Sequence, residues 1–359
     1  MAFGTYQSQN LNLDEARAGV EAHVKVFNAS GGAAGHQIQV IVCNDNFDPN
    51  TAAACARQAV DKKVVAVVGP ASGYASAALP ILDAAKIPYL NGSGAGGVIE
   101  LTSPDSFPLH GGSQVQLMGA GRVLVDKGSK NVTIVVADAD QAREAAKNIV
   151  KAITLGGGTA ATVNAPLGAP DYSAVAASAL TNNPDGIVIA HVPADAPKII
   201  QALRQAGYKG RIATSTGILT QTGITAIGEA AEGVLLLDRG ALSSDTTIPE
   251  VAAFNTAMAA DAPNAKIDAA SLNGWAGVTF FVELVKQTTG DITGAALIGT
   301  LHHIKTPIVT TIFPPYSGPS ATPPVADFPQ VVSFKANLAI VKGGKVVSNG
   351  GFIDPLAKA

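Results

Sequence analysis

Residues 64–74 have the sequence VVAVVGPASGY, in which an apolar run meets a glycine–proline turn and a short polar loop. The apolar run is continuous rather than alternating, which is typical of a strand buried on both faces of a parallel sheet. Similar runs lie at 37–43, 89–90, 132–137, 186–190, 211–214 and 234–237. These runs predict a fold built on parallel β-strands.

Helical patterns lie between the predicted strands. In residues 13–29, Val20, Val24 and Phe27 share one face, and the glycines at 31–32 predict the end of the helix. Residues 141–155 repeat this pattern and end at three glycines. Because strands that alternate with helices need crossover connections, the pattern predicts a doubly wound α/β sheet.

The alternation occurs twice along the chain, which predicts two similar α/β lobes. We assign 1–115 with 242–330 to the first lobe and 116–241 with 331–359 to the second. The last third of the chain offers helices at 249–260 and 270–287 and strand-like runs at 308–312, 331–334, 338–341 and 346–347. We interpret this part as chain that crosses between the lobes. Since ligands of open α/β sheets bind at the carboxyl ends of strands, we expect a site between the lobes.

Composition excludes several classes of protein. Of the 359 residues, 47% are hydrophobic and 14% charged, which excludes a disordered chain. The formal net charge of −3 is spread without a basic stripe, so we expect no nucleic-acid partner. The sequence has no apolar run of the length that a membrane span requires.

Two cysteines are present. Cys43 ends a predicted strand, and Cys55 lies in the following helix, which Asp48 is expected to cap with Pro49 as its first residue. The two thiols can come within bonding reach, and a disulfide closing this loop would contribute about 3 kcal/mol in an oxidising compartment. Two buried free thiols are the alternative. With no neighbouring ligands, the cysteines predict no metal site.

Polar loops follow four of the predicted strands. Their sequences are GPASGY at 69–74, NGSGAGG at 91–97, DADQ at 138–141 and HVPAD at 191–195. Serine hydroxyls and amides at a helix start can hold an anion, so Ser72 and Ser93 are our candidate anion contacts, with Gly94 beside them. The alternative is that both serines only cap helices or turns.

The glycine run at 92–97 also matches a dinucleotide-binding pattern. That pattern requires a following helix, and Pro104 and Pro108 leave no room for one of adequate length. The sequence has no phosphate-binding loop, zinc-protease motif or nucleophile elbow. We therefore expect that the protein binds no cofactor and has no enzymatic activity.

Three further candidates are charged or titratable. Asp138 and Asp140 could receive a ligand ammonium, although for Asp140 a role as cap of the next helix is favoured. His191 directly follows a predicted strand, so it is a candidate ligand contact or a structural histidine.

Three aromatic residues complete the candidates. Trp275 lies in the first turns of a long helix, where it would either pack in the core or stack on a ligand. Tyr6 follows the first strand and Tyr74 lies at a helix start, and each has a polar tip that could face a ligand.

The motifs and their order resemble the type I periplasmic solute-binding proteins, and among them the branched-chain amino acid (leucine/isoleucine/valine) receptors of ABC importers. The matching segments are FNASGGAAG at 27–35, IQVIVCN at 38–44, DP at 48–49, VAVVGP at 65–70, IPY at 87–89, LRQAGY at 203–208 and AAEGV at 230–234. The resemblance implies two Rossmann-like lobes joined by three crossovers, an extracytoplasmic location, and ligand capture without chemistry.

The resemblance also assigns roles to residues. Ser72 matches the serine that holds a ligand carboxylate, and Ser93 falls near the second hydroxyl-bearing loop. The groups that would hold an α-ammonium differ, because Ala142 stands near the expected tyrosine and Thr216 near the expected glutamate. A buried ammonium without an anionic partner is costly. We therefore expect a small carboxylate- or amide-bearing ligand, unless Asp138 or Asp195 replaces the glutamate.

The sequence thus predicts a monomeric solute-binding protein that delivers a small molecule to an ABC permease. We expect it in the periplasm or lipid-anchored at the cell surface, as a mature chain whose export signal has been removed. A ligand-sensing receptor or regulator of the same bilobed fold is the alternative.

Overall fold

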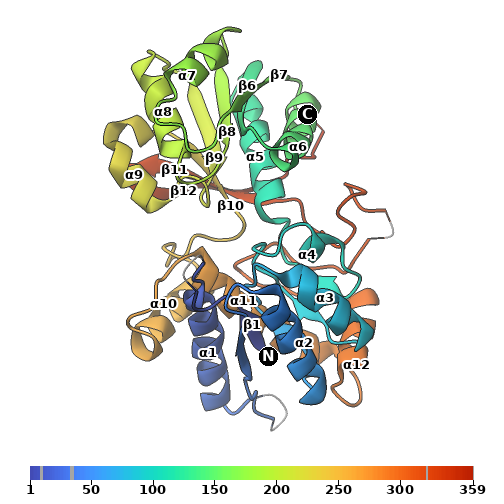
Figure 1. The fold of residues 1–359 in the computed structure, drawn as a ribbon. Helices are drawn as coiled ribbons and strands as arrows, with labels where there is room; N and C mark the ends of the chain where they lie inside the picture. The colour runs from blue at the N-terminus through green and yellow to red at the C-terminus, as the bar shows by residue number, and fades with distance from the viewer. Residues whose placement is uncertain (9–10, 33–35, 321, 359) are drawn as a thin grey trace. The chain divides into compact units, whose positions relative to one another are not determined.

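A computed structural model describes residues 1–8, 11–32, 36–320 and 322–358 (Figure 1). The chain forms two compact units. Unit 1 comprises Met1–Gly111 and Gly240–Ser333, and unit 2 comprises Gly112–Arg239 and Phe334–Ala359. The chain therefore passes between the units three times.

Unit 1 is built on short parallel strands. They are β1 (Ala2–Gly4), β2 (Val42–Asn44), β3 (Val67–Val68), β4 (Tyr89–Leu90) and β5 (Ser106–Phe107). β1 pairs with β2, and β3, β4 and β5 form a second ladder. A parallel bridge between Gly4 and Ala71 joins the two ladders. The order is therefore β2-β1-β3-β4-β5, with all carboxyl ends at one edge.

Helices connect and cover these strands. They are α1 (Asp14–Ala29), α2 (Pro49–Asp61), α3 (Ala75–Ala84), α4 (Ile99–Thr102), α10 (Pro249–Asp261), α11 (Ala269–Gln287) and α12 (Gly294–His302). The predicted start of α2 is confirmed, because the Asp48 carboxylate accepts from the Thr51 amide at 2.7 Å and Pro49 is the first residue. α1 ends at Ala29, as predicted, and Gly31, with φ +100°, lies two residues beyond it.

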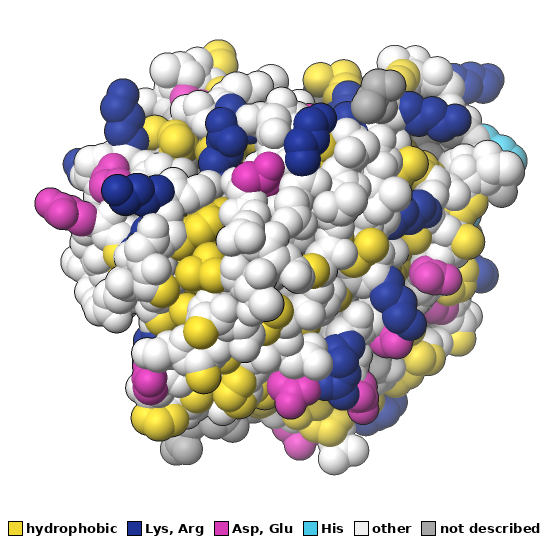
Figure 2. All heavy atoms as spheres, turned by 90° about the horizontal axis from the view of Figure 1, so that it is seen from above, with side chains coloured by type: hydrophobic (Ala, Val, Ile, Leu, Met, Phe, Trp, Pro, Cys, Tyr) yellow, Lys and Arg dark blue, Asp and Glu magenta, His cyan; other side chains and the backbone are white. Residues whose placement is uncertain are grey.

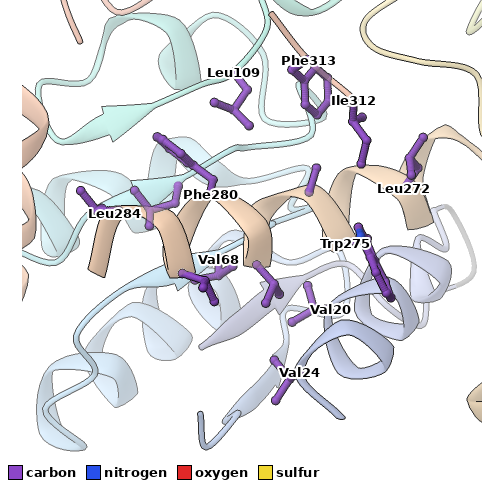
Figure 3. Packing of buried hydrophobic residues seen from close by; sticks show 14 of the residues in the cluster. Val20, Val24, Val68, Leu109, Leu272, Trp275, Phe280, Leu284, Ile312 and Phe313 are labelled. Carbon is purple, nitrogen blue, oxygen red and sulfur yellow. The ribbon is translucent and has the colours of Figure 1, made fainter. Parts of the chain in front are cut away.

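The core of unit 1 gathers around α11 (Figure 3). Val20 and Val24 of α1 and Val68 of β3 lie on one side of this helix, and Ile312 and Phe313 lie on the other. A second cluster beneath α2 and α3 includes Phe3, Leu79 and Tyr89 among its members.

Two glycines let α1 and α11 pack closely. A Cβ at Gly19 would lie 1.9 Å from the Ser271 carbonyl oxygen, and a Cβ at Gly274 would lie 2.1 Å from the Ala16 carbonyl oxygen. Both distances are far below contact range, so only glycine fits at these positions.

Unit 2 contains one sheet in the order β12-β11-β10-β9-β8-β6-β7. Its strands are β6 (Asn131–Ala137), β7 (Thr159–Ala165), β8 (Gly186–Ala190), β9 (Arg211–Ser215), β10 (Leu235–Asp238), β11 (Ala336–Lys342) and β12 (Lys345–Ile353). β6 to β10 are parallel, whereas the pairs β10–β11 and β11–β12 are antiparallel.

The helices of unit 2 are α5 (Gly112–Asp126), α6 (Asp140–Leu155), α7 (Ser173–Leu180), α8 (Ala196–Gln205) and α9 (Gln221–Ile227), followed by the 3₁₀ turn η1 (Gly228–Ala231). Together the two units confirm the predicted α/β fold of doubly wound lobes.

Several local predictions are wrong. The strand predicted over 37–43 shortens to β2, because the Asn28 side chain binds the Ile38 carbonyl at 2.9 Å and its amide at 2.8 Å. Residues 308–312 form only one bridge, between Ile308 and Tyr316, and residues 331–334 lie outside any strand. The sequence also did not predict β7, an edge strand with a weak pattern of threonines and alanines.

The predicted Cys43–Cys55 disulfide is present and links β2 to α2, with a Cα–Cα distance of 5.8 Å.

Of the matched family motif at 27–35, Ala33, Ala34 and Gly35 lie outside the described residues. In the part of the chain that the structure describes, no helix has the length and hydropathy needed to cross a membrane.

Figure 2 shows one face of the molecule, on which lysine and arginine side chains lie among aspartates and glutamates. On this face, neither sign of charge gathers into a continuous stripe of the kind that binds a nucleic-acid backbone.

Candidate functional site

Asp45 is the centre of a buried polar network at the carboxyl edge of unit 1. It follows β2 directly and is fully buried. Its Oδ1 accepts from the Thr5 hydroxyl at 2.6 Å and from the Phe47 amide at 2.9 Å, and its Oδ2 accepts from the Ser72 hydroxyl. Asp45 and Thr5 were not among the predicted site residues.

Ser72 is therefore tied inside unit 1. Besides donating to Asp45, its Oγ accepts from the Tyr74 amide at 3.0 Å, which is the short turn that serine commonly forms. The Tyr74 ring packs against Phe47, with 4.9 Å between the ring centroids. These contacts match the turn-forming alternative for Ser72, and its contact with a ligand stays a prediction.

Ser93 lies next to the Ser72 loop, because its amide donates to the Pro70 carbonyl at 2.9 Å. The glycine loop then folds around a buried glutamate of its own chain. Glu100 accepts from the Gly94 amide at 2.7 Å, from the Gly96 amide at 3.1 Å and from the Tyr89 hydroxyl at 3.1 Å. The backbone nest that the sequence offered for a ligand thus binds an internal carboxylate.

The remaining aromatic candidates of unit 1 are buried. Tyr6 is 2% exposed, and its hydroxyl has no hydrogen-bond partner among the described residues. Trp275 is also 2% exposed and stacks on the His23 ring, with 3.9 Å between centroids. Its edge contact with Phe254 completes an aromatic cluster in the core, which matches the packing alternative, and contact of Trp275 with a ligand stays a prediction.

A further buried network joins the ends of β4 and β5 to α11. Asn91 donates through Nδ2 to the Asn273 carbonyl at 3.1 Å, and Asn273 donates back to the Asn91 carbonyl at 3.1 Å. His110 lies 3.1 Å from Asn273 Oδ1 through its Nε2. Neither asparagine was predicted, although Asn91 directly follows a predicted strand.

His191 lies at the carboxyl end of β8 and is buried between two partners. Its Nε2 donates to the Ala165 carbonyl at 3.2 Å, and its Nδ1 lies 3.6 Å from Asp195 Oδ2. Asp195 also accepts from the Gly168 amide at 2.8 Å. Burial opposes ionisation of Asp195, but this amide, the Tyr172 hydroxyl and the nearby imidazole together lower its pKa. These hydrogen bonds hold the loop after β8 against the loop after β7.

The other candidates of unit 2 lie at the ends of β6 and β9. Asp138 and Asp140 are exposed and both pair with Arg143, and neither caps α6 through its side chain. Thr216 donates to Asp238 Oδ2 at 2.7 Å, and Asp238 is a buried carboxylate that the sequence did not flag.

The structure therefore brings Ser72, Tyr74, Ser93 and Gly94 together at one edge of unit 1. Asp138, His191 and Thr216 follow neighbouring parallel strands of unit 2, but each is held by a different local partner. Among the described residues, no group of three histidine, cysteine, aspartate or glutamate side chains is placed to hold a metal ion.

Two α/β units whose polar side chains gather after parallel strands define the class of bilobed ligand-binding proteins. A periplasmic binding protein family model matches residues 8–323, so the chain belongs to the periplasmic binding protein family. This is a family of ligand-binding and transport proteins rather than of enzymes.

Among curated relatives, the Leu/Ile/Val-binding protein of Escherichia coli K12 is 25% identical over 235 residues. The alignment covers 62% of this chain and 62% of that relative, which is less than two thirds of the relative's length.

Solved structures share the fold over nearly the whole chain. An extracellular ligand-binding receptor from Verminephrobacter eiseniae is 18% identical with a TM-score of 0.73, covering 96% of this chain and 98% of that one. A leucine-binding protein from Thermotoga maritima is 18% identical with a TM-score of 0.69, covering 99% and 98%. An ABC transporter solute-binding protein from R. palustris, solved with benzoate, is 21% identical with a TM-score of 0.70, covering 98% and 94%.

Proposed function

We propose that this protein is an extracytoplasmic solute-binding protein that captures a small amide- or carboxylate-bearing molecule between its two units and delivers it to an ABC permease. The observation that carries the proposal is the combination of the family match with buried polar networks at the carboxyl edge of unit 1. In open α/β sheets this edge is where ligands bind.

Two positions argue against an ordinary amino acid as the ligand. Ala142 has no polar side chain, and the Thr216 hydroxyl already donates to Asp238. An α-ammonium would therefore lack the anionic partner expected for it, and burying it would be unfavourable. The relatives include a leucine-binding protein and a benzoate complex, so aliphatic and aromatic compounds both belong in the first test panel.

Ligand capture is tested by thermal unfolding of the full chain with leucine, valine, isovalerate, isovaleramide, benzoate and benzamide. A bound compound raises Tm because it binds only the folded state. Small-angle scattering on the same samples then measures closure, which we expect as a decrease in the radius of gyration. Tight leucine binding would contradict the ligand class, and a binder that leaves the radius of gyration unchanged would contradict capture by closure.

Delivery is tested in cells. Deletion of the gene is expected to abolish high-affinity uptake of the radiolabelled ligand, and a plasmid copy is expected to restore it. Unchanged uptake by the deletion strain would favour the ligand-sensing alternative.

A further inference from the structure

Unit 1 contains a cavity of about 310 Å³ beside the start of β1. Met1 and Ala2 line it, together with residues 38–41, which precede β2, and residues 62–66, which precede β3. Helices α1 and α11 contribute apolar side chains to the lining, and these are Val20, Val24, Val278 and Phe281. Figure 3 shows Val20 and Val24 beside α11. Apolar side chains that face a cavity lack contacts on that side.

Two stretches of chain, 38–41 and 62–66, form the side walls of the cavity, and β1 sets the distance between them. β1 pairs with β2 on one side, and on the other side the Met1 carbonyl accepts from the Val68 amide of β3 at 3.0 Å. Neighbouring strands lie about 4.8 Å apart, so β2 and β3 are held about 9.6 Å apart with one strand between them. Since all three strands are parallel, the residues before β2 and before β3 flank the cavity at the same spacing.

Both walls have the sequence pattern of strands but do not form them. The apolar runs at 37–43 and 64–68 predict strands of that length, whereas β2 begins at Val42 and β3 at Val67. These starts lie opposite the start of β1, because Val42 pairs with Ala2 and the residue after Val67 donates its amide to Met1. Each wall therefore stops being a strand where β1 offers it no partner.

Four backbone groups of the walls have the spacing of a sheet. They are the Ile41 amide and the Gln39 carbonyl on one wall, and the Ala66 amide and the Val64 carbonyl on the other. Within residues 1–8, 11–32, 36–320 and 322–358, none of these four groups has a hydrogen-bond partner. Ala66 is 2% exposed, and proteins pair nearly all of their buried backbone groups. On each wall the carbonyl lies two residues before the amide, and one residue of a parallel strand binds such a pair.

We propose that this cavity takes a short extended segment, joined to the amino side of Met1, that continues β1 between the two walls with apolar side chains. The inference goes beyond the proposed function, because it concerns the assembly of unit 1. A joined segment fits because Met1 lies at the cavity and its nitrogen already donates to the Ala66 carbonyl at 2.7 Å. A joined segment also loses less freedom on binding than a separate peptide does.

The register of β1 assigns a direction to each added side chain. Ala2 packs in the core beside α1 and α11, whereas Met1 and Phe3 pack in the cluster beneath α2 and α3. Because side chains alternate along a strand, the first added residue faces α1 and α11, and the second faces α2. Apolar side chains suit both positions. Exposed Lys62 and Lys63 also line the cavity, and they favour an acidic residue at the outer end of the segment.

The same register assigns a partner to each added backbone carbonyl. The carbonyl of the first added residue accepts from the Ile41 amide, and that of the second accepts from the Ala66 amide. Two extended chains test this order by amide hydrogen exchange. One carries a single valine ahead of Met1, and the other carries Glu-Val-Ile-Val. We expect the single valine to slow exchange at Ile41 alone, and the longer extension to slow both amides, by about tenfold each.

Stability gives a second readout. The Glu-Val-Ile-Val extension is expected to raise the Tm of unit 1, followed by Trp275 emission, by about 4 °C or more, because it fills the cavity and pairs both walls. The matched control is Glu-Val-Pro-Val, which keeps the length and the charge. Its proline has no N–H group for the Val64 carbonyl and is disfavoured inside a sheet, so the rise in Tm is expected to be less than half as large.

Unchanged exchange at Ile41 in both extended chains would overturn the inference, as would an equal rise in Tm from the proline control. The single valine is the smallest possible addition, so it decides the matter even where the longer extension fails to fold. Acetyl-Glu-Val-Ile-Val-amide, added in excess to the unextended chain, is expected to leave Tm unchanged. An equal rise in Tm from this free peptide would identify a separate chain as the occupant and would overturn the assignment to a joined segment.

Discussion

Ser72 has one hydroxyl, and two neighbouring groups depend on it. Its hydrogen goes to Asp45, its oxygen receives the Tyr74 amide, and the side chain is fully buried. Replacement by alanine leaves a buried carboxylate and an amide each short of one partner. Such groups cost about 1–3 kcal/mol each when they stay unsatisfied.

We therefore expect Ser72→Ala to lower the free energy of unfolding in urea by about 2 kcal/mol. Ser76→Ala is the control, because Ser76 lies exposed in the first turn of α3. Its loss is expected to leave the stability nearly unchanged. Equal midpoints for the two variants would show that the Asp45 network does not stabilise the fold.

His23 is expected to make the free energy of unfolding depend on pH. The direction of this dependence follows from the surroundings of the His23 ring. Burial lowers its pKa from the ordinary 6.5, and the hydrogen bond from its Nδ1 to the Trp275 carbonyl, at 2.9 Å, only partly opposes this shift. Because the unfolded chain then takes up a proton more readily than the folded one, stability is lost as pH falls below about 6.5.

The prediction is a free energy of unfolding that decreases between pH 7.5 and pH 5.5. His23→Phe keeps a ring that can stack on Trp275 and removes the titrating group. Its free energy of unfolding is expected to change less over the same interval. A variant with the same slope as the wild-type protein would assign the pH dependence to other groups.

The sequence predicted residue roles only where partners lie close along the chain. The Asp48 cap depends on Thr51, three residues away, and was predicted correctly. The Asp45 network joins Thr5, Asp45 and Ser72, which meet only after three strands have assembled. A buried aspartate after a strand is the signal that could have found it, but the identity of its partners depends on the tertiary fold.

At the scale of an element, the loop between β4 and α4 is shaped by Glu100. Its carboxylate holds two glycine amides and the Tyr89 hydroxyl, and the side chain is 1% exposed. The hairpin of β11 and β12 offers a natural comparison. There the exposed Glu232 accepts from the amides of Gly343 and Gly344 at 3.0 and 2.6 Å.

We expect Glu100→Ala to cost about 2 kcal/mol or more in the free energy of unfolding, since it leaves buried donors unsatisfied. Hydrogen exchange at the Gly94 and Gly96 amides is expected to accelerate with it. Glu232→Ala removes the same kind of contact at a solvated turn, where water replaces the carboxylate, so its effect is expected to be smaller. The reverse order of the two losses would contradict the assigned role of Glu100.

Helices with a strong apolar face were predicted nearly to the residue, whereas several strands were predicted too long or were not predicted. α11 was expected over 270–287 and spans Ala269–Gln287. β7 has no such signal, because its partner β6 covers only one side and its side chains remain largely exposed. Strand pairing between distant segments decides such an element, and a local pattern does not contain that information.

At the scale of the whole molecule, each unit is assembled from two segments that lie far apart in the sequence. Unit 2 takes its last two strands from residues 334–359, and β10 pairs with β11 along Leu235↔Ile340, Leu236↔Ala339 and Leu237↔Leu338. Unit 1 needs none of these residues. The only tryptophan, Trp275, lies in the core of unit 1, so its fluorescence reports on unit 1 alone.

A chain ending at Ser333 is therefore expected to lose unit 2 and keep unit 1. Without β11, the backbone of β10 becomes an unpaired edge and its leucines lose their cover, so far-UV circular dichroism should decrease and a hydrophobic dye should bind. Trp275 emission should stay blue-shifted and unfold cooperatively in urea, because α1, α11 and their core contacts remain. A chain ending at Ile353 retains β11 and β12 and is expected to match the full-length protein in both signals. Red-shifted emission from the Ser333 chain in buffer would mean that unit 1 cannot fold without unit 2.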